Sequence, residues 1–221
     1  MDLDHLIELH PQLFHMAEAG SWPAIAEHGL LPTRTIVETS DLGEQGKSEL
    51  LDQRRATSVR MLHPQLGEVV VRDQGPLNLT HLEPKLVDVS VQGWLDILNE
   101  RVFFWLHPDK LAGLLTARRY RNSVQDVLTL DTRSLLESAQ ERVRLSPINS
   151  GAALYPNATP RGSQTFLPIA DYDYAARRRA RGSVDAIVEL AVIGGVPDIA
   201  EHVVSVRRMQ GLEEIGEYSL R

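Results

Sequence analysis

The chain contains no cysteine. This absence excludes disulfide bonds, thiolate nucleophiles and zinc sites with cysteine ligands. The sequence also lacks any apolar run of the roughly 20 residues that cross a bilayer. Its first residues contain no cationic segment followed by an apolar one, so they do not resemble a secretion signal. These missing signals predict a cytoplasmic protein that has no membrane partner.

The common catalytic and phosphate-binding motifs are missing as well. We find no Gly-x-Gly-x-x-Gly turn and no Gly-x-x-x-x-Gly-Lys-[Ser/Thr] loop, so the usual dinucleotide and nucleoside triphosphate cradles are absent. The sequence also has no His-Glu-x-x-His motif and no Gly-x-Ser-x-Gly elbow. The eight histidines are scattered, so we expect no metal site. A Ser-His-Asp triad stays open, because its members are dispersed in sequence, but no motif indicates one.

Positive charge is scarce, since the 221 residues carry a formal charge of -7. Such a chain lacks a general electrostatic attraction to nucleic acid or to anionic membranes. Two basic clusters, Arg118–Arg121 and Arg177–Arg181, interrupt this acidic background. Each cluster is either a solvated helix face or the contact for an anionic ligand.

Residue patterns predict interleaved helices and strands. Helical spacing at Leu3–Leu9 ends at His10–Pro11, and Ser21 begins a helix that ends at Gly29. The most apolar short run, Val102–Leu106, predicts a central strand. Further strands are predicted at Leu13–Met16, Glu68–Arg72, Val124–Leu130, Asp185–Val192 and His202–Val206. Further helices are predicted at Ser48–Thr57, Leu79–Leu86, Val89–Leu98, Pro108–Arg119, after a cap at Asp131, and as one turn at Arg177–Arg181. Because the order lacks regular βαβ repetition, we expect an α+β fold.

Residues 145–174 break this pattern and are dense in turn formers. An irregular segment of this length in a compact domain is often functional.

Three short segments are similar to the core of the ADP-ribosyltransferase folds. In many of these folds a hydrophobic residue and a histidine end the first strand, as Phe14 and His15 do here. The next helix in them closes on Ile-x-x-x-Gly-Leu, which is the pattern from Ile25 to Leu30. A late strand carries a glutamate, which here is Glu189.

The resemblance is closest to the DarT-like nucleic-acid ADP-ribosyltransferases and a related uncharacterised bacterial domain family. In the DarT-like enzymes an arginine pair and an aromatic strand lie between the histidine and the glutamate. The similar residues here are Arg55 and the run Phe103–Trp105. The resemblance spans about residues 13–206, whereas residues 131–183 do not align with it.

The resemblance implies a single domain over residues 1–221, with an N-terminal helix at about 1–12 and an acceptor-side loop region at about 145–182. It implies an α+β architecture of split mixed or antiparallel sheets flanked by helices. The expected activity is NAD+-dependent mono-ADP-ribosyl transfer, with NAD+ as substrate and no metal. The expected acceptor is single-stranded DNA or RNA, and the expected role is that of a toxin or defence enzyme with an antitoxin or immunity partner.

The resemblance also implies roles for individual residues. Glu189 would stabilise the positive charge that develops on the ribose, since NAD+ is an N-glycoside. Arg55 would contact the phosphates or Glu189, and His15 would donate a hydrogen bond to the ribose. The remaining NAD+-binding residues would be Phe14, Met16, Phe104 and Trp105. Arginines and tyrosines that suit phosphates and bases would bind the acceptor, namely Arg161, Tyr172, Tyr174, Arg177 and Arg178.

Other interpretations stay open at this point. Glu189 could be an edge-strand glutamate that faces water, and His15 a structural histidine. The acceptor could be a protein. An RNA 2'-phosphotransferase shares the histidine strand and the Gly-Leu opening, but its usual His-x-His pattern is missing here. A non-catalytic module that binds NAD+ or ADP-ribose is the alternative of another class, because a fold does not determine a function.

Overall fold

The computed structural model describes residues 1–220, which form a seven-stranded sheet, a two-stranded sheet and flanking helices. The large sheet has the strand order β6-β7-β4-β1-β5-β8-β9, and every neighbouring pair in it is antiparallel. Its strands are β1 (Gln12–Glu18), β4 (Arg101–Trp105), β5 (Val124–Asp131), β6 (Val143–Ser146), β7 (Glu189–Ile193), β8 (Val203–Gln210) and β9 (Glu213–Glu217). The expected α+β class is confirmed.

Helices surround this sheet, and most of them are short. They are α1 (Leu3–Leu9), α2 (Trp22–His28), α3 (Thr33–Glu38), α4 (Glu44–Leu51), α5 (Leu79–Leu82), α6 (Val91–Asn99), α7 (Pro108–Leu115), α8 (Thr132–Ala139), α9 (Tyr174–Arg181) and α10 (Ile199–His202). Within residues 1–220, none is long and apolar enough to span a membrane.

Local signals explain several of these boundaries. The Asp131 side chain accepts a hydrogen bond from the backbone N–H of Ser134 at 2.8 Å and so caps α8, as predicted. Gly29 ends α2 with a φ of 88°, a conformation that favours glycine. A Cβ atom at Gly29 would also lie 2.6 Å from the Cα of Pro197. The chain that leaves α2 can therefore pack closely against residues 196–197, where Leu30 and Val196 form an isolated bridge.

The main hydrophobic core joins the central strands to α8. Leu13 of β1, Phe104 of β4, Leu128 of β5 and Leu190 of β7 are each at most 1% exposed and belong to this one cluster. A second cluster forms around Trp94 of α6. Burial of these side chains on the strands next to β1 makes the centre of the sheet the most fully packed part of the fold.

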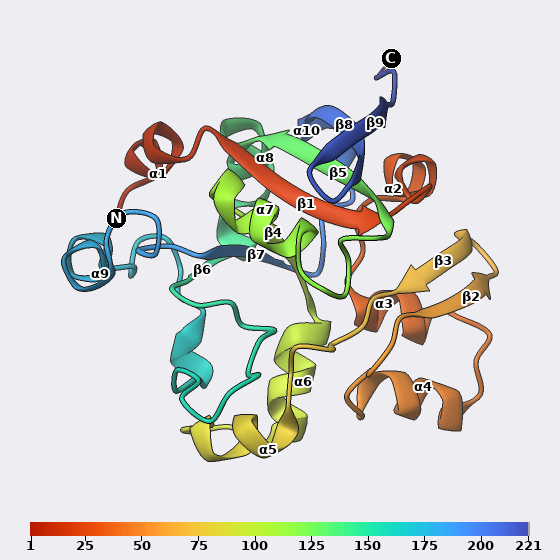
Figure 1. Cartoon of the computed structure of the whole chain (residues 1–221), viewed down its shortest axis with the longest axis horizontal. Coiled ribbons are helices and arrows are strands. Elements are labelled where there is room, and N and C mark those ends of the chain that lie inside the picture. Colours follow the sequence, from red (N-terminus) through yellow and green to blue (C-terminus); the bar gives the residue numbers. More distant parts are fainter. Residues whose placement is uncertain (221) are drawn as a thin grey trace.

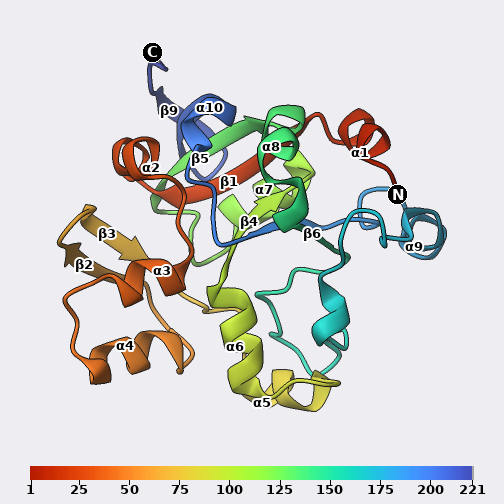
Figure 2. The same cartoon turned by 180° about the vertical axis from the view of Figure 1, so that it is seen from behind.

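Residues 33–74, which we call the hairpin lobe, form a separate layer beside the large sheet. The lobe contains α3, α4 and the antiparallel pair β2 (Val59–His63) and β3 (Gly67–Val71). Figure 1 shows these four elements grouped on one side of the molecule, and Figure 2 shows the same grouping from behind. The lobe has its own small core of Val37, Leu50, Leu51 and Val71.

Some sequence predictions were wrong in their bounds. The helix predicted at Ser48–Thr57 is α4, which ends at Leu51, and Arg54 and Arg55 follow in an irregular segment. A guanidinium N–H of Arg55 donates to the Leu50 carbonyl, which is one of the last carbonyls of α4 and lacks a partner within the helix. The strand predicted from Asp185 begins only at Glu189, because Ala186 closes a turn onto Ser183.

The strands β2, β6 and β9 were not predicted. All five residues of β9 are exposed, so this edge strand has no buried face to produce an alternating pattern.

The helix predicted at Pro108–Arg119 ends at Leu115, and turns follow it.

Candidate functional site

A cavity of about 370 Å³ lies between the central strands and the hairpin lobe. This volume falls within the range of small-molecule binding sites. The strands contribute His15, Arg101, Trp105 and Glu189 to its wall, and the lobe contributes residues of β3 and the segment that follows it. Residues from opposite ends of the chain therefore meet at one cavity.

Two strand pairings bring His15 and Glu189 to this cavity. The strands β1 and β4 share a single register pair, Phe14 with Trp105, whereas β1 pairs with β5 along its whole length. On its other side Trp105 pairs with Glu189 of β7. The backbones of Phe14 and Glu189 are thus separated by two strand spacings, or about 10 Å. Trp105 lies between the strand of His15 and the strand of Glu189.

Glu189 is a buried carboxyl group with one backbone donor. The side chain is 4% exposed, and the backbone N–H of Ser150 donates to its Oε2 at 3.0 Å. Burial raises the pKa of Glu189 to about 7, although hydrogen bonding from Ser150 and the charge of Arg161 act in the opposite direction. Because β7 lies between β6 and β4, the interpretation as an edge-strand glutamate facing water is wrong. Glu189 can exchange a proton near neutral pH.

Arg161 supports the segment that contacts Glu189. Its Nη1 donates to the carbonyls of Ser150 and Ala152 at 3.1 and 2.8 Å, and its Nε donates to the Thr159 carbonyl. With an exposure of 3%, Arg161 is not available on an outer acceptor surface as we expected from the sequence. It instead fixes the position of the Ser150 backbone and places a positive charge close enough to affect Glu189.

The ring of His15 is oriented by the neighbouring strand. Its Nδ1 lies 2.9 Å from the Phe103 carbonyl oxygen, which can only accept, so Nδ1 carries the proton. Burial is the main cause that lowers the pKa of His15 to about 4, and the charge of Arg72 adds to it. The neutral ring therefore presents Nε2 as a hydrogen-bond acceptor, whereas the sequence led us to expect a donor.

Arg55 lines the cavity, but most of its donors are used within the protein. Its guanidinium donates to the Leu50 carbonyl, to the Arg72 carbonyl and to Oδ1 of Asn99. Burial lowers its pKa to about 10, so the group stays charged at neutral pH. These bonds connect α4, the end of β3 and α6. Arg54 is not among the residues that line the cavity.

Two other arginines in the cavity wall were not predicted. Arg72 donates to Oε1 of Gln125 at 2.7 Å, and its guanidinium lies 5.0 Å from the ring centre of Tyr120. The Nε of Arg101 is buried and has no hydrogen-bond partner among residues 1–220. Arg101 is the first residue of β4 and directly precedes the predicted strand Val102–Leu106, so its sequence position indicated a strand boundary and not a binding residue. Its guanidinium lies 5.2 Å from the ring centre of Phe166, and its Nη1 donates to the Ile97 carbonyl.

The predicted apolar residues divide between cavity and core. Met16, Phe104 and Trp105 line the cavity, and the Phe104 ring lies 5.7 Å from that of His15. Phe14 is buried with Met16 in a small cluster against α7 and does not belong to the cavity wall. Trp105 is half-buried, as are Phe103 and Tyr120, which also line the cavity.

None of the five predicted acceptor residues lines this cavity. Tyr172 and Tyr174 are core residues with exposures of 1% and 6%, and the Tyr172 hydroxyl donates to the Ala186 carbonyl. These buried side chains cannot stack on an acceptor. Arg177 and Arg178 belong to α9, and Figure 1 shows this helix on the side of the molecule away from the hairpin lobe. Arg178 is exposed to solvent.

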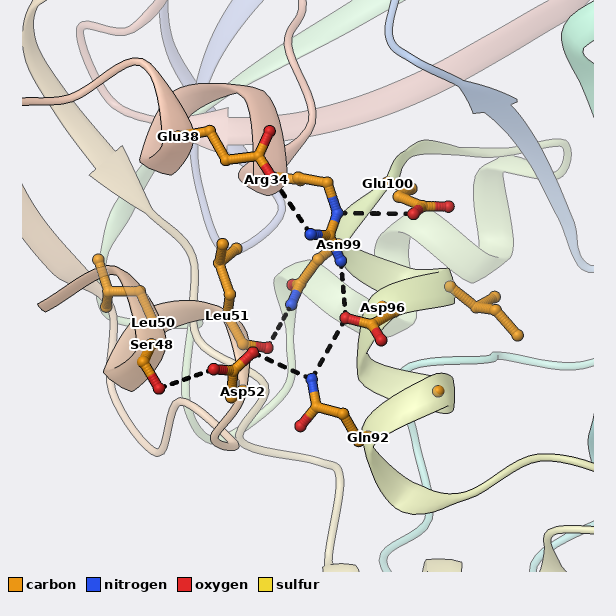
Figure 3. Close-up of polar contacts among 12 residues, drawn as sticks. Arg34, Glu38, Ser48, Leu50, Leu51, Asp52, Gln92, Asp96, Asn99 and Glu100 are labelled. Atoms are coloured by element: carbon orange, nitrogen blue, oxygen red, sulfur yellow. Dashed lines mark hydrogen bonds and ion pairs between the residues drawn. The ribbon is translucent and has the colours of Figure 1, made fainter. Parts of the chain in front are cut away.

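Polar contacts attach the hairpin lobe to α6. Arg34 of α3 contacts Asp96 at 2.6 Å and Glu100 at 3.5 Å. The side chain of Asn99 donates to the Leu51 carbonyl at 3.0 Å, as Figure 3 shows. Gln92 donates to both Asp52 of the lobe and Asp96 of its own helix. These contacts from one helix hold the lobe over the cavity.

Comparison with known proteins gives one family. No curated protein matches the sequence. The family described as "Family of unknown function (DUF7002)" matches residues 11–203, a span that includes both His15 and Glu189. Since this match covers well over half of the 221 residues, the chain belongs to the DUF7002 family.

Proposed function

We propose that this protein is an NAD+-dependent mono-ADP-ribosyltransferase that binds NAD+ in the cavity between the central strands and the hairpin lobe. The observation that carries the proposal is that His15 of β1 and Glu189 of β7 line the same cavity. The single register pair between β1 and β4 gives further support. Such a weak link between two otherwise paired sets of strands fits the split-sheet architecture of the ADP-ribosyltransferase folds.

The cavity has the chemistry that a dinucleotide requires. Its wall is mainly apolar with a few polar groups, which suits a nucleotide with flat rings. Arg72 and Arg101 both line the cavity, and their guanidinium groups can bind phosphate oxygens, since such groups match phosphate geometry. The half-buried ring of Trp105 can stack on the nicotinamide or the adenine.

Glu189 would act at the ribose next to the nicotinamide. The bond between ribose C1' and the nicotinamide nitrogen breaks, and neutral nicotinamide leaves with the bonding electron pair. The ribose then carries positive charge, which a nearby carboxylate stabilises electrostatically. A new bond forms between C1' and the acceptor, and the proton of the acceptor is lost to a base. A carboxylate with a pKa of about 7 is suited to accept that proton at neutral pH.

His15 would orient the ribose. Its neutral ring can accept a hydrogen bond from a ribose hydroxyl at Nε2, because Nδ1 is already bonded to the Phe103 carbonyl. The pKa of about 4 keeps the ring in this form throughout the physiological pH range. Fixing the ribose in this way supplies part of the barrier reduction.

The acceptor that we propose is a nucleic acid, DNA or RNA, following the resemblance to the DarT-like enzymes. A toxin or defence role in the cytoplasm, with an antitoxin or immunity partner, belongs to the same proposal. The basic helix α9 is the most strongly cationic surface element, because four of its eight residues are arginines.

The proposal is tested with purified protein, labelled NAD+ and separate pools of single-stranded DNA, duplex DNA, RNA and cell proteins. We expect label transfer and nicotinamide release, both reduced about a hundredfold or more in Glu189→Gln. Glu137→Gln, an exposed glutamate on α8, is the matched control and should keep full activity. If label is transferred only to proteins, the acceptor is a protein and the proposed nucleic-acid acceptor is wrong. Binding of NAD+ without cleavage would indicate a binding module, and no binding at millimolar NAD+ would overturn the proposal.

A further inference from the structure

A second cavity, of about 550 Å³, is lined by residues that directly precede the segment that contacts Glu189. Its wall includes these residues, Pro147 and Ile148, together with Asp88, and Arg177 and Arg181 of α9. Ser150, which donates to Glu189, follows Ile148 by two residues. One stretch of chain therefore contributes to both cavities, and Arg161 stabilises it.

The charge in this second cavity is mainly positive. Arg161, Arg177 and Arg181 all line it, whereas Asp88 is the one carboxylate in its wall. Both oxygens of Asp88 are already used, because they accept hydrogen bonds from the backbone N–H and the hydroxyl of Ser163. The close approach of Asp88 depends on Gly162, where a Cβ atom would lie 2.0 Å from Oδ1 of Asp88.

Arg177 and Arg181, the two arginines of α9 that line this cavity, are not paired at close range with a carboxylate of the described chain, although the charge of Arg181 helps to lower the pKa of Asp185. In residues 1–220, neither Arg177 nor Arg181 forms an ion pair within 4.0 Å. Arg177 lies over the ring of Tyr172 at 4.9 Å, a contact that fixes the side chain but leaves its charge uncompensated. Arg181 donates one N–H to the Pro147 carbonyl, and within residues 1–220 its other guanidinium donors form no hydrogen bond.

We propose that the second cavity is a binding site for a phosphate group, which Arg177 and Arg181 contact. A phosphate matches the forked donors of two guanidinium groups and supplies the negative charge that the wall lacks. The phosphate can belong to a nucleic-acid backbone or to a small free phosphate compound. The inference that the phosphate belongs to a nucleic-acid acceptor rests on the proposed function, because a transferase must hold its acceptor near Glu189.

The test measures binding in the absence of NAD+, with inorganic pyrophosphate and a single-stranded oligothymidylate of about twelve nucleotides as probes. We expect the double variant Arg177→Gln/Arg181→Gln to bind each of the two probes about tenfold or more weakly than the wild type does. The slope of log affinity against log salt for the oligonucleotide should fall by about 1 for each arginine removed. The matched control is Arg178→Gln/Arg179→Gln, which removes the same charge from the same helix outside the cavity wall.

Binding of the oligonucleotide without competition from pyrophosphate would identify a nucleic-acid backbone as the source of the phosphate. Competition between them would identify a site that also accepts free phosphate compounds. If Arg178→Gln/Arg179→Gln weakens binding as much as the cavity variant does, the attraction is a diffuse charge effect and the proposal is overturned. The proposal is also overturned if neither probe binds the wild type at low salt. Arg181→Gln alone, at an exposed position, should give a partial loss of probe binding. Nicotinamide release is measured separately, so failure of the transferase proposal does not affect this result.

Discussion

The backbone N–H of Ser150 donates to Oε2 of Glu189 at 3.0 Å, inside a site where this glutamate is 4% exposed. Burial outweighs the hydrogen bonding from Ser150 and the charge of Arg161, so the pKa of Glu189 is raised to about 7. The first two predictions follow from this imbalance.

Glu189→Gln should stabilise the fold at high pH. The pKa of Glu189 in the folded chain is about 7 against an ordinary value of 4.5, so ionisation in the folded state costs about 3 kcal/mol of folding free energy above pH 7. The cost is absent below pH 4.5 and grows between these two values. Urea unfolding of the variant and the wild type at about pH 4 and about pH 8 measures the difference. A stability change of the same size at both pH values would contradict the burial argument, and Glu137→Gln serves as the exposed control.

Nicotinamide release should rise with pH through about 7 and then stay level, because the carboxylate form of Glu189 is the active one. His15, with a pKa of about 4, is neutral across this range and should add no second limb. The measurement is kcat/KM for NAD+ between about pH 5 and about pH 9. A profile that falls across neutral pH would show that a protonated group is required instead.

Arg55→Met should destabilise the protein by about 3 kcal/mol or more, because it leaves the Leu50 and Arg72 carbonyls and the Asn99 side chain without their donor. Arg54→Met removes only the bond to the Gly75 carbonyl and should cost about 1 kcal/mol or less. Denaturant unfolding measures the free energy of unfolding of both variants, which alter neighbouring residues of the same type. Equal losses would mean that the network around Asn99 does not stabilise the fold.

Arg101→Gln should raise the KM for NAD+ about tenfold while kcat changes little, since a phosphate contact is made equally in the ground state and the transition state. Steady-state kinetics at a fixed acceptor concentration separate the two constants. Arg133→Gln, on the exposed face of α8, is the control. A fall in kcat at unchanged KM would instead place Arg101 at the reacting bond.

Local sequence signals predicted the central part of the fold. The helix Leu3–Leu9 has the predicted bounds, and Asp131 caps α8 as expected. The strands that carry His15 and the Phe103–Trp105 run were predicted because their apolar residues are buried on the sheet.

The destinations of polar residues could not be predicted in the same way. Arg55 and Arg161 are held by carbonyls that are distant in sequence or belong to irregular segments, and no local periodicity encodes such contacts. The irregular stretch from residue 145 was expected to be functional, yet the role of Ser150 depends on a backbone N–H, which every residue except proline carries. Tyr172 and Tyr174 resembled surface residues beside the arginines but are buried in the core.

The hairpin lobe has a consequence for how this family can diversify. One uninterrupted stretch, residues 33–74, forms its own small core and supplies one wall of the cavity. The strands that hold His15 and Glu189 lie outside that stretch. Insertions, deletions or substitutions in the lobe can therefore reshape what the cavity admits while the opposite wall keeps its geometry, so selectivity and reactivity can evolve as separate traits.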